Sequence, residues 1–302
     1  MKIFDNFAIC ALTAAALNGL IGPLTKLTLL QGVGASQIAF TKAFIAFFLL
    51  LGYCLLTGKA RELSRVGKQW PTLAVLAFLG IFSLYFFETQ AFAEASVSLV
   101  SFLTYAAGGF TILLSAIFLN ERLTLLKSVS FLTIIAGVLL MLNVGSEMSG
   151  SMKGATLALL GGLGYALFIF FAKYNNVGSG LCQLVWLFGF GSLYLFPPAL
   201  AAGFSAPSLS AILSLVALVV FPTIGGFYLT TRAIKLGEAG RVQIIETSDP
   251  LFATMFAFIL FGEVLSLSAA WGAGFVMVGL LCSLLASRNT QSVYPKSENV
   301  NS

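Results

Sequence analysis

The chain has 302 residues, of which 59% are apolar and only 9% are charged, and its formal net charge is +5. Soluble domains carry about a quarter charged residues, so this composition indicates a chain made for the lipid bilayer. Lysines and arginines are spread over short loops rather than gathered in a patch, which argues against a nucleic-acid partner. The sequence has no histidine, and its four cysteines have no paired spacing. We therefore expect no metal site, no cofactor and no enzymatic activity.

Ten apolar runs follow one another along the chain, and a transmembrane helix needs about 20 such residues. They cover about 7–29, 36–57, 71–91, 96–119, 126–144, 153–173, 180–202, 211–231, 239–261 and 267–287. The predicted fold class is an all-α membrane protein with ten transmembrane helices. Residues 288–302 are polar, and we expect them to form a disordered cytoplasmic tail.

The distribution of lysine and arginine predicts the orientation. The segment 58–69 holds Lys59, Arg61, Arg65 and Lys68, whereas the loops of opposite parity carry almost nothing except Lys153. Other cations on the same side as 58–69 are Arg122, Lys127, Lys173, Arg232, Lys235, Arg241, Arg288 and Lys296. Positive charge stays on the cytoplasmic side. We therefore expect a multi-pass protein of the cytoplasmic (inner) membrane with both termini in the cytoplasm.

The two halves of the chain repeat each other. Residues 71–140 align without a gap on 213–282 at an offset of 142 positions, which brings Glu121 onto Glu263. Lys26 matches Lys173 at a slightly larger offset. We divide the chain into a five-helix repeat over 1–144 and a second over 145–287. Because five is odd, the second must run inverted, as in many secondary transporters whose site lies near the midplane between the repeats.

The run from Arg241 to Leu265 contains two acidic residues close to its middle, Glu246 and Asp249, followed by Pro250. A charged side chain at the bilayer centre costs roughly 2.5–3.5 kcal/mol on insertion scales, so two in one span require a reason. Their i, i+3 spacing places them on one face of a helix, and Pro250 predicts a kink there. This pattern indicates a solute or coupling site. The alternative is a structural kink with both carboxylates satisfied inside the bundle.

The stretch AIKLGEAGRVQIIETSDPLFATMFAFILFGEVLS, which begins at Ala233, resembles the EamA domain of the drug/metabolite transporter superfamily. Phe92 to Thr124 is a second, weaker copy, in which Gly108 stands where the first has Pro250. The resemblance covers nearly the whole chain. It implies two domains of five helices each and a proton- or gradient-coupled exporter or exchanger of small organic solutes, without naming the solute.

Four charged residues in or near the spans have distinct expected roles. Lys42 lies a few residues inside the second span, where the family often has arginine. It can pair with Asp249 or Glu88, or else snorkel outward without a partner. Glu88 can neutralise Lys42 or accept a coupling proton. Lys26 is nearer its helix end and is expected to snorkel, and Glu263 is expected to cap a helix or pair with a loop cation.

Aromatic residues in the span interiors suggest the walls of a cavity. Tyr105, Tyr165 and Trp186 fall there rather than at the membrane interfaces, so they suit an amphiphilic or aromatic solute. The alternative is that they face lipid, as many aromatics do in membrane proteins. Asn18 gives the first span a polar group and is a candidate substrate contact. Glycines that allow close helix contacts include Gly161, Gly162 and Gly164.

These observations predict a secondary active transporter of amino-acid-like or amphiphilic metabolites that works by alternating access, with proton coupling. One rival hypothesis is an organic-anion or nucleotide-type exchanger in which Lys42 is the main anchor. Another is a non-transporting membrane scaffold. The expected partners are a small-molecule solute and the lipid bilayer, and both a monomer and a homodimer remain open.

Overall fold

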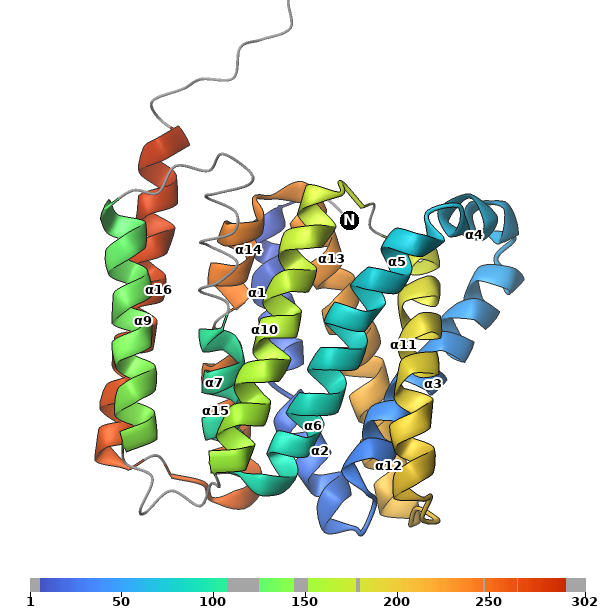
Figure 1. The fold of residues 1–302 in the computed structure, drawn as a ribbon, viewed down its shortest axis with the longest axis horizontal. Helices are drawn as coiled ribbons and strands as arrows, with labels where there is room; N and C mark the ends of the chain where they lie inside the picture. The colour runs from blue at the N-terminus through green and yellow to red at the C-terminus, as the bar shows by residue number, and fades with distance from the viewer. Residues whose placement is uncertain are drawn as a thin grey trace, which may run out of the picture.

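The computed structural model describes residues 6–107, 125–143, 152–177, 180–246, 248–264 and 266–291. Within these ranges the chain is almost entirely helical (Figure 1). Six helical stretches are long and apolar enough to cross a membrane: Phe7–Leu30, Ala35–Leu56, Trp70–Glu94, Met152–Tyr174, Leu181–Ala202 and Leu209–Leu236. Each coincides with a predicted span, so the expectation of a multi-pass helical membrane protein is confirmed.

The first half contains α1 (Phe7–Asn18), α2 (Ile21–Leu30), α3 (Ala35–Leu56), α4 (Ala60–Gly67), α5 (Trp70–Ala77), α6 (Leu84–Glu94), α7 (Val97–Ala106) and α9 (Leu125–Asn143). The second half contains α10 (Met152–Tyr174), α11 (Leu181–Ala202), α12 (Leu209–Leu218), α13 (Phe227–Leu236), α14 (Ala239–Glu246), α15 (Asp249–Phe261) and α16 (Leu267–Gln291). The segment 58–69 holds a short helix, α4. Helix α16 continues to Gln291, into the expected tail, and the rest of that tail lies outside the described residues.

The four remaining predicted spans coincide with shorter or partly described helices. The run 96–119 begins with α7, and 126–144 and 267–287 coincide with α9 and α16. The run 239–261 is divided between α14 and α15. Gly108 and Glu121 lie outside the described residues.

Two of the long spans are interrupted at their centres by π-helical segments, Phe78–Ser83 between α5 and α6 and Val219–Gly226 between α12 and α13. In each, a hydroxyl donates to the carbonyl five residues back: Ser83 to Phe78 at 3.0 Å and Thr223 to Leu218 at 2.8 Å. Insertions of this kind are frequent at functional sites because they turn side chains out of the regular helical register.

The span that contains Pro250 is divided between two helices, and Thr247 between them lies outside the described residues. α14 ends at Glu246 and α15 begins at Asp249, with Pro250 in its first turn. Proline suits this position because the first amide groups of a helix have no partner within the helix. The two acidic residues therefore sit at the end of one helix and the start of the next, rather than on a continuous helical face.

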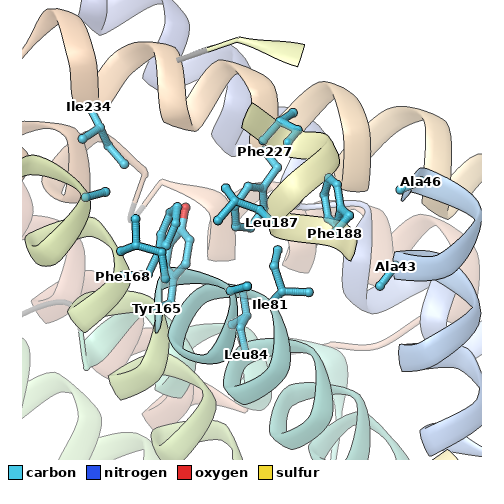
Figure 2. Packing of buried hydrophobic residues seen from close by; sticks show 14 of the residues in the cluster. Ala43, Ala46, Ile81, Leu84, Tyr165, Phe168, Leu187, Phe188, Phe227 and Ile234 are labelled. Atoms are coloured by element: carbon cyan, nitrogen blue, oxygen red, sulfur yellow. The ribbon is translucent and has the colours of Figure 1, made fainter. Parts of the chain in front are cut away.

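Helix α10 runs through the middle of the molecule and packs on α6 and α7. Its glycines permit this contact, because a Cβ at Gly162 would strike the Thr104 carbonyl and one at Gly161 would lie 3.2 Å from the Glu88 amide nitrogen. The expected close contacts along α10 are confirmed. The largest apolar core lies beside it and includes Ile81, Phe168 and Phe227 (Figure 2).

The remaining helices pack around this centre. α3 packs along α11 on one flank, and α9 packs along α16 on the other. Helix α1 begins and α16 ends on the same edge of the molecule, which is also the edge that carries α4 (Figure 1).

Candidate functional site

Asp249 is buried at the first turn of α15 and is bound by a tyrosine from the other half of the chain. The Tyr105 hydroxyl, from α7, donates to Asp249 Oδ2 at 2.6 Å. Asp249 is 3% exposed and Tyr105 is 6% exposed. The break between α14 and α15 places this carboxyl inside the bundle, and the contact joins the two halves through two buried side chains.

Glu246 ends α14 and accepts two short hydrogen bonds. The Tyr165 hydroxyl, from α10, donates to Oε2 at 2.6 Å, and the Thr230 hydroxyl, from α13, donates to Oε1 at 2.6 Å. Both oxygens of this fully buried carboxyl are thereby satisfied, as buried polar groups require. The rings of Tyr105 and Tyr165 meet edge to face with centroids 6.1 Å apart, which brings the two tyrosine–acid pairs next to each other.

Lys42 and Glu88 form a third polar group from α3 and α6. Lys42 is 1% exposed, and its Nζ lies over the Tyr85 ring, 3.8 Å from the ring centroid. The ammonium and the Glu88 carboxyl attract each other electrostatically. Within the described part of the chain, neither Lys42 Nζ nor Glu88 Oε2 has a hydrogen-bond partner. Two buried ionisable groups therefore keep hydrogen-bonding capacity that a ligand can use.

A small cavity lies at the meeting point of these groups. Its lining includes Asn18, Glu88, Tyr105 and Tyr165, together with Phe227. Traced by the centre of a water-sized sphere, its volume is about 10 Å³, which leaves room for roughly one water molecule. An organic solute does not fit unless the surrounding helices move. The described acidic residues do not group in a way that could hold a metal ion.

The cluster contains more acid than base. Lys42 is the only fully buried lysine or arginine among the described residues, whereas Glu88, Glu246 and Asp249 are all buried. Glu88 and Glu246 both act on Asp249 as like charges. A buried charge is costly without a counter-charge, so this site favours added protons or a cationic group.

The structure brings seven of the eight predicted site residues together: Asn18, Lys42, Glu88, Tyr105, Tyr165, Glu246 and Asp249. The eighth, Trp186, lies elsewhere, in an apolar groove between α3 and α11, where its Nε1 donates to the Leu63 carbonyl at 3.0 Å. Of the two partners expected for Lys42, the structure brings Glu88 close, and Asp249 instead binds Tyr105. Because Lys42 is buried, it does not snorkel outward.

Sequence reasoning missed the role of Thr230 as a partner of Glu246 and that of Tyr85 as the aromatic face under Lys42. The sequence contains one indication of the role of Thr230, because it is a polar residue in an apolar span. Tyr85 precedes Glu88 by three positions and so shares its helical face.

Two further lysines cap helix ends outside the cluster. Lys26 Nζ donates to the Ala95 carbonyl at 3.3 Å and lies 3.4 Å from Glu263 Oε1. Lys173 Nζ donates to the carbonyls of Gly237 at 2.6 Å and Ile234 at 3.3 Å. Lys26, which was expected to snorkel, has these partners at its helix end, and the expected pairing of Glu263 with a cation is observed.

The model of the EamA-like transporter family matches this chain over residues 6–143 and 152–285. An uncharacterized transporter of Archaeoglobus fulgidus is 26% identical over 87% of this chain and 91% of its own length. Another uncharacterized transporter, YdfC of Bacillus subtilis, is 24% identical over 84% of this chain and 82% of its own.

Similarity extends to an animal protein and to a solved structure. Solute carrier family 35 member G1 of Mus musculus is 25% identical over 85% of this chain and 71% of its own length. A protein crystal structure at 19% identity superposes with a TM-score of 0.74 and covers 94% of this chain and 98% of the other. At that identity the superposition establishes a shared fold.

Proposed function

The chain belongs to the EamA-like transporter family and is a membrane transporter rather than an enzyme, and we propose that it is a secondary active transporter of small organic solutes. The observation that carries this proposal is the buried cluster of Lys42, Glu88, Glu246 and Asp249. Its members come from both halves of the chain. Glu88 lines a cavity too small for an organic solute, together with Tyr105 and Tyr165, which bind the other two acids. Such a site suits an occluded conformation, from which alternating access opens one side at a time.

The proposed solutes are amino-acid-like or amphiphilic molecules. The cluster contains three buried carboxyls and one buried ammonium, so a solute ammonium improves the charge balance. Tyr105, Tyr165 and Phe227 offer aromatic walls for an apolar part of the solute, and aromatic faces attract cations. The second candidate is an organic anion or nucleotide-type solute, favoured by the absence of a hydrogen-bond partner for Lys42 Nζ within the described chain.

Several equivalent features support the proposed inverted repeat. The two π-helical segments begin at Phe78 and Val219, and α9 and α16 begin at Leu125 and Leu267, so both pairs are separated by nearly the offset that relates Glu121 to Glu263. In each half a lysine caps the third span: Lys26 at Ala95 and Lys173 at Gly237. These spans end on opposite edges of the molecule (Figure 1), as inverted repeats require.

In the proposed cycle, a proton gradient drives solute transport. Glu246 and Asp249 are the groups that bind and release the protons. Both carboxyls lie where a span is broken, and such breaks mark the coupling sites of many transporters. Protonation when one side is open and release when the other opens would link proton entry to solute exit. We place the protein in a cytoplasmic (inner) membrane with both ends in the cytoplasm, because the edge that carries α4 is rich in lysine and arginine.

A counterflow screen in proteoliposomes tests the function. The panel consists of amino acids, amphiphilic amines and organic anions. For each solute, vesicles containing the purified protein are preloaded with the unlabelled form, and uptake of the labelled form of the same solute is measured. We expect selective counterflow with a solute that contains an ammonium group. The control is Lys153→Gln, whose ion pair with Glu94 lies outside the cluster and which should behave like the parent protein. Counterflow of anions alone would favour the second candidate, and none across the panel would contradict transport of these solutes.

A further inference from the structure

A long apolar groove runs along the outer wall of the molecule, between α3 and α11. Its volume is about 550 Å³, within the range of about 300–1,000 Å³ that is typical of small-molecule sites. On α3 it is lined by Phe40, Phe44, Phe47 and Leu51, which are spaced so that they share one helical face. Both helices are long and apolar enough to span a membrane, so the groove opens toward the bilayer.

The length of the groove matches the depth of one leaflet. From Phe40 to Leu51, α3 rises by about 16 Å. The hydrocarbon core of a bilayer is about 30 Å thick, so one leaflet contributes about 15 Å. Almost all of the surface that lines the groove is apolar, so water is a poor occupant. A single extended acyl chain fits both its length and its chemistry.

The amphipathic helix α4 closes one end of the groove. Leu63 faces inward and lines it, and Trp186 inside the groove donates a hydrogen bond to the Leu63 carbonyl at 3.0 Å. Arg61 and Arg65 are exposed on the other side of α4. Glu62, the acidic residue of this helix, interacts with the Cys182 thiol, so its carboxylate points toward α11.

The surroundings of α4 place it at the level of the lipid headgroups. Trp70, which follows α4, is 57% exposed, and Tyr53 before it is 46% exposed. Exposed tryptophan and tyrosine gather at the membrane–water interface. Lys59 and Lys68 flank α4, and with its two arginines they give this segment four cations against one acid. Arginine binds phosphate oxygens in a bidentate manner.

We propose that this wall of the molecule is a binding site for an anionic phospholipid of the leaflet on the α4 side. One acyl chain occupies the groove between α3 and α11, and the phosphate and its anionic headgroup contact Arg61 and Arg65. The site is separate from the central cluster, so it does not depend on which solute is transported. A phosphatidylglycerol-type headgroup has the required charge.

Quenching of Trp186 fluorescence by brominated lipid tests both parts of the proposal. The chain has three tryptophans, and the double variant Trp70→Phe/Trp271→Phe leaves Trp186 as the sole tryptophan, which is excited selectively. It is reconstituted in phosphatidylcholine with rising fractions of phosphatidylglycerol that carries brominated acyl chains, or of equally brominated phosphatidylcholine. We expect the phosphatidylglycerol to quench at a severalfold lower mole fraction. Arg61→Gln/Arg65→Gln should abolish this preference, because each cation near the membrane surface contributes roughly fivefold in affinity, equivalent to about 1 kcal/mol.

Two controls separate this site from general lipid contact. Trp271, on α16, is 65% exposed, and as the sole tryptophan it should be quenched equally by both lipids. Lys153→Gln should leave the Trp186 preference unchanged. Equal quenching of Trp186 by the two lipids, or a preference that survives Arg61→Gln/Arg65→Gln, would overturn the proposal. So would displacement of the lipid by soluble glycerol phosphate, because that would indicate an anion site without an acyl chain.

Discussion

Lys42 illustrates how a single buried charge depends on its neighbours. Its ammonium lies on the Tyr85 ring and is attracted by Glu88. Removing one partner of a buried charge pair leaves the other uncompensated, which typically costs about 3–5 kcal/mol. We therefore expect Lys42 and Glu88 to act as a unit, so they should be tested together.

Lys42→Met should destabilise the protein and impair transport, because the Glu88 carboxyl then lacks its counter-charge. Adding Glu88→Gln should restore most of the lost stability, although not the transport. Lys42→Arg keeps the charge and should be better tolerated. Thermal unfolding in detergent and counterflow in proteoliposomes measure the two effects. Additive losses in the double variant would show that the two residues are independent.

The tyrosine–acid pairs predict a graded effect of losing each hydroxyl. A hydrogen bond to a charged group contributes about 1.5–3 kcal/mol. After Tyr165→Phe, Glu246 retains the bond from Thr230, whereas Tyr105→Phe removes the bond that Asp249 accepts from α7. We expect Tyr105→Phe to impair counterflow more than Tyr165→Phe does. The reverse order would show that Glu246 is the more sensitive carboxyl.

At the scale of elements, the contact of α10 with α7 depends on a missing side chain. A Cβ at Gly162 would meet the Thr104 carbonyl, whereas one at Gly274 of α16 has nothing within 4 Å. Gly162→Ala should therefore lower the melting temperature by several degrees, although alanine favours helix by about 1 kcal/mol over glycine. Gly274→Ala is the matched control and should be neutral or stabilising. Equal melting temperatures for the two variants would contradict this account of the contact.

Much of the helical architecture could be predicted from the apolar runs, because lipid requires long apolar helices whose backbone bonds are internal. The π-helical segments could not, since Phe78–Ser83 carries no residue pattern that distinguishes it from regular helix. The division of this span between α14 and α15 was anticipated only as a kink, because Pro250 removes one backbone hydrogen bond and does not by itself end a helix. The ten-span inverted repeat stays a prediction.

The depth of a residue in the membrane could be predicted better than the direction in which its side chain points. Sequence position put Tyr105, Tyr165 and Trp186 all inside spans, but packing turned the two tyrosines to the central acids and Trp186 to the outer groove. Likewise, depth alone allowed Lys42 either acidic partner. Which of the two acids lies near Lys42 depends on the rotation of α3 relative to α6. That rotation arises from contacts between helices that are distant in the sequence.

At the scale of the whole molecule, the predicted orientation has a direct test. Ser64 is exposed on α4, and Ser208 is exposed at the start of α12 on the opposite edge of the molecule (Figure 1). In a cysteine-free background, an impermeant thiol reagent applied to intact cells should label Ser208→Cys and not Ser64→Cys. Disrupted cells should label both. Labelling of Ser64→Cys alone in intact cells would show that the orientation is opposite to the predicted one.

The central claim is that the buried acids between the two halves couple protons to solute movement, and Asp249→Asn tests it most directly. Asparagine keeps the shape of the side chain and can still bond with Tyr105, but it cannot take up and release a proton. With a solute identified by counterflow, we predict that Asp249→Asn abolishes accumulation driven by a pH gradient while exchange of labelled for unlabelled solute continues. Normal pH-driven accumulation by both Asp249→Asn and Glu246→Gln would contradict the account.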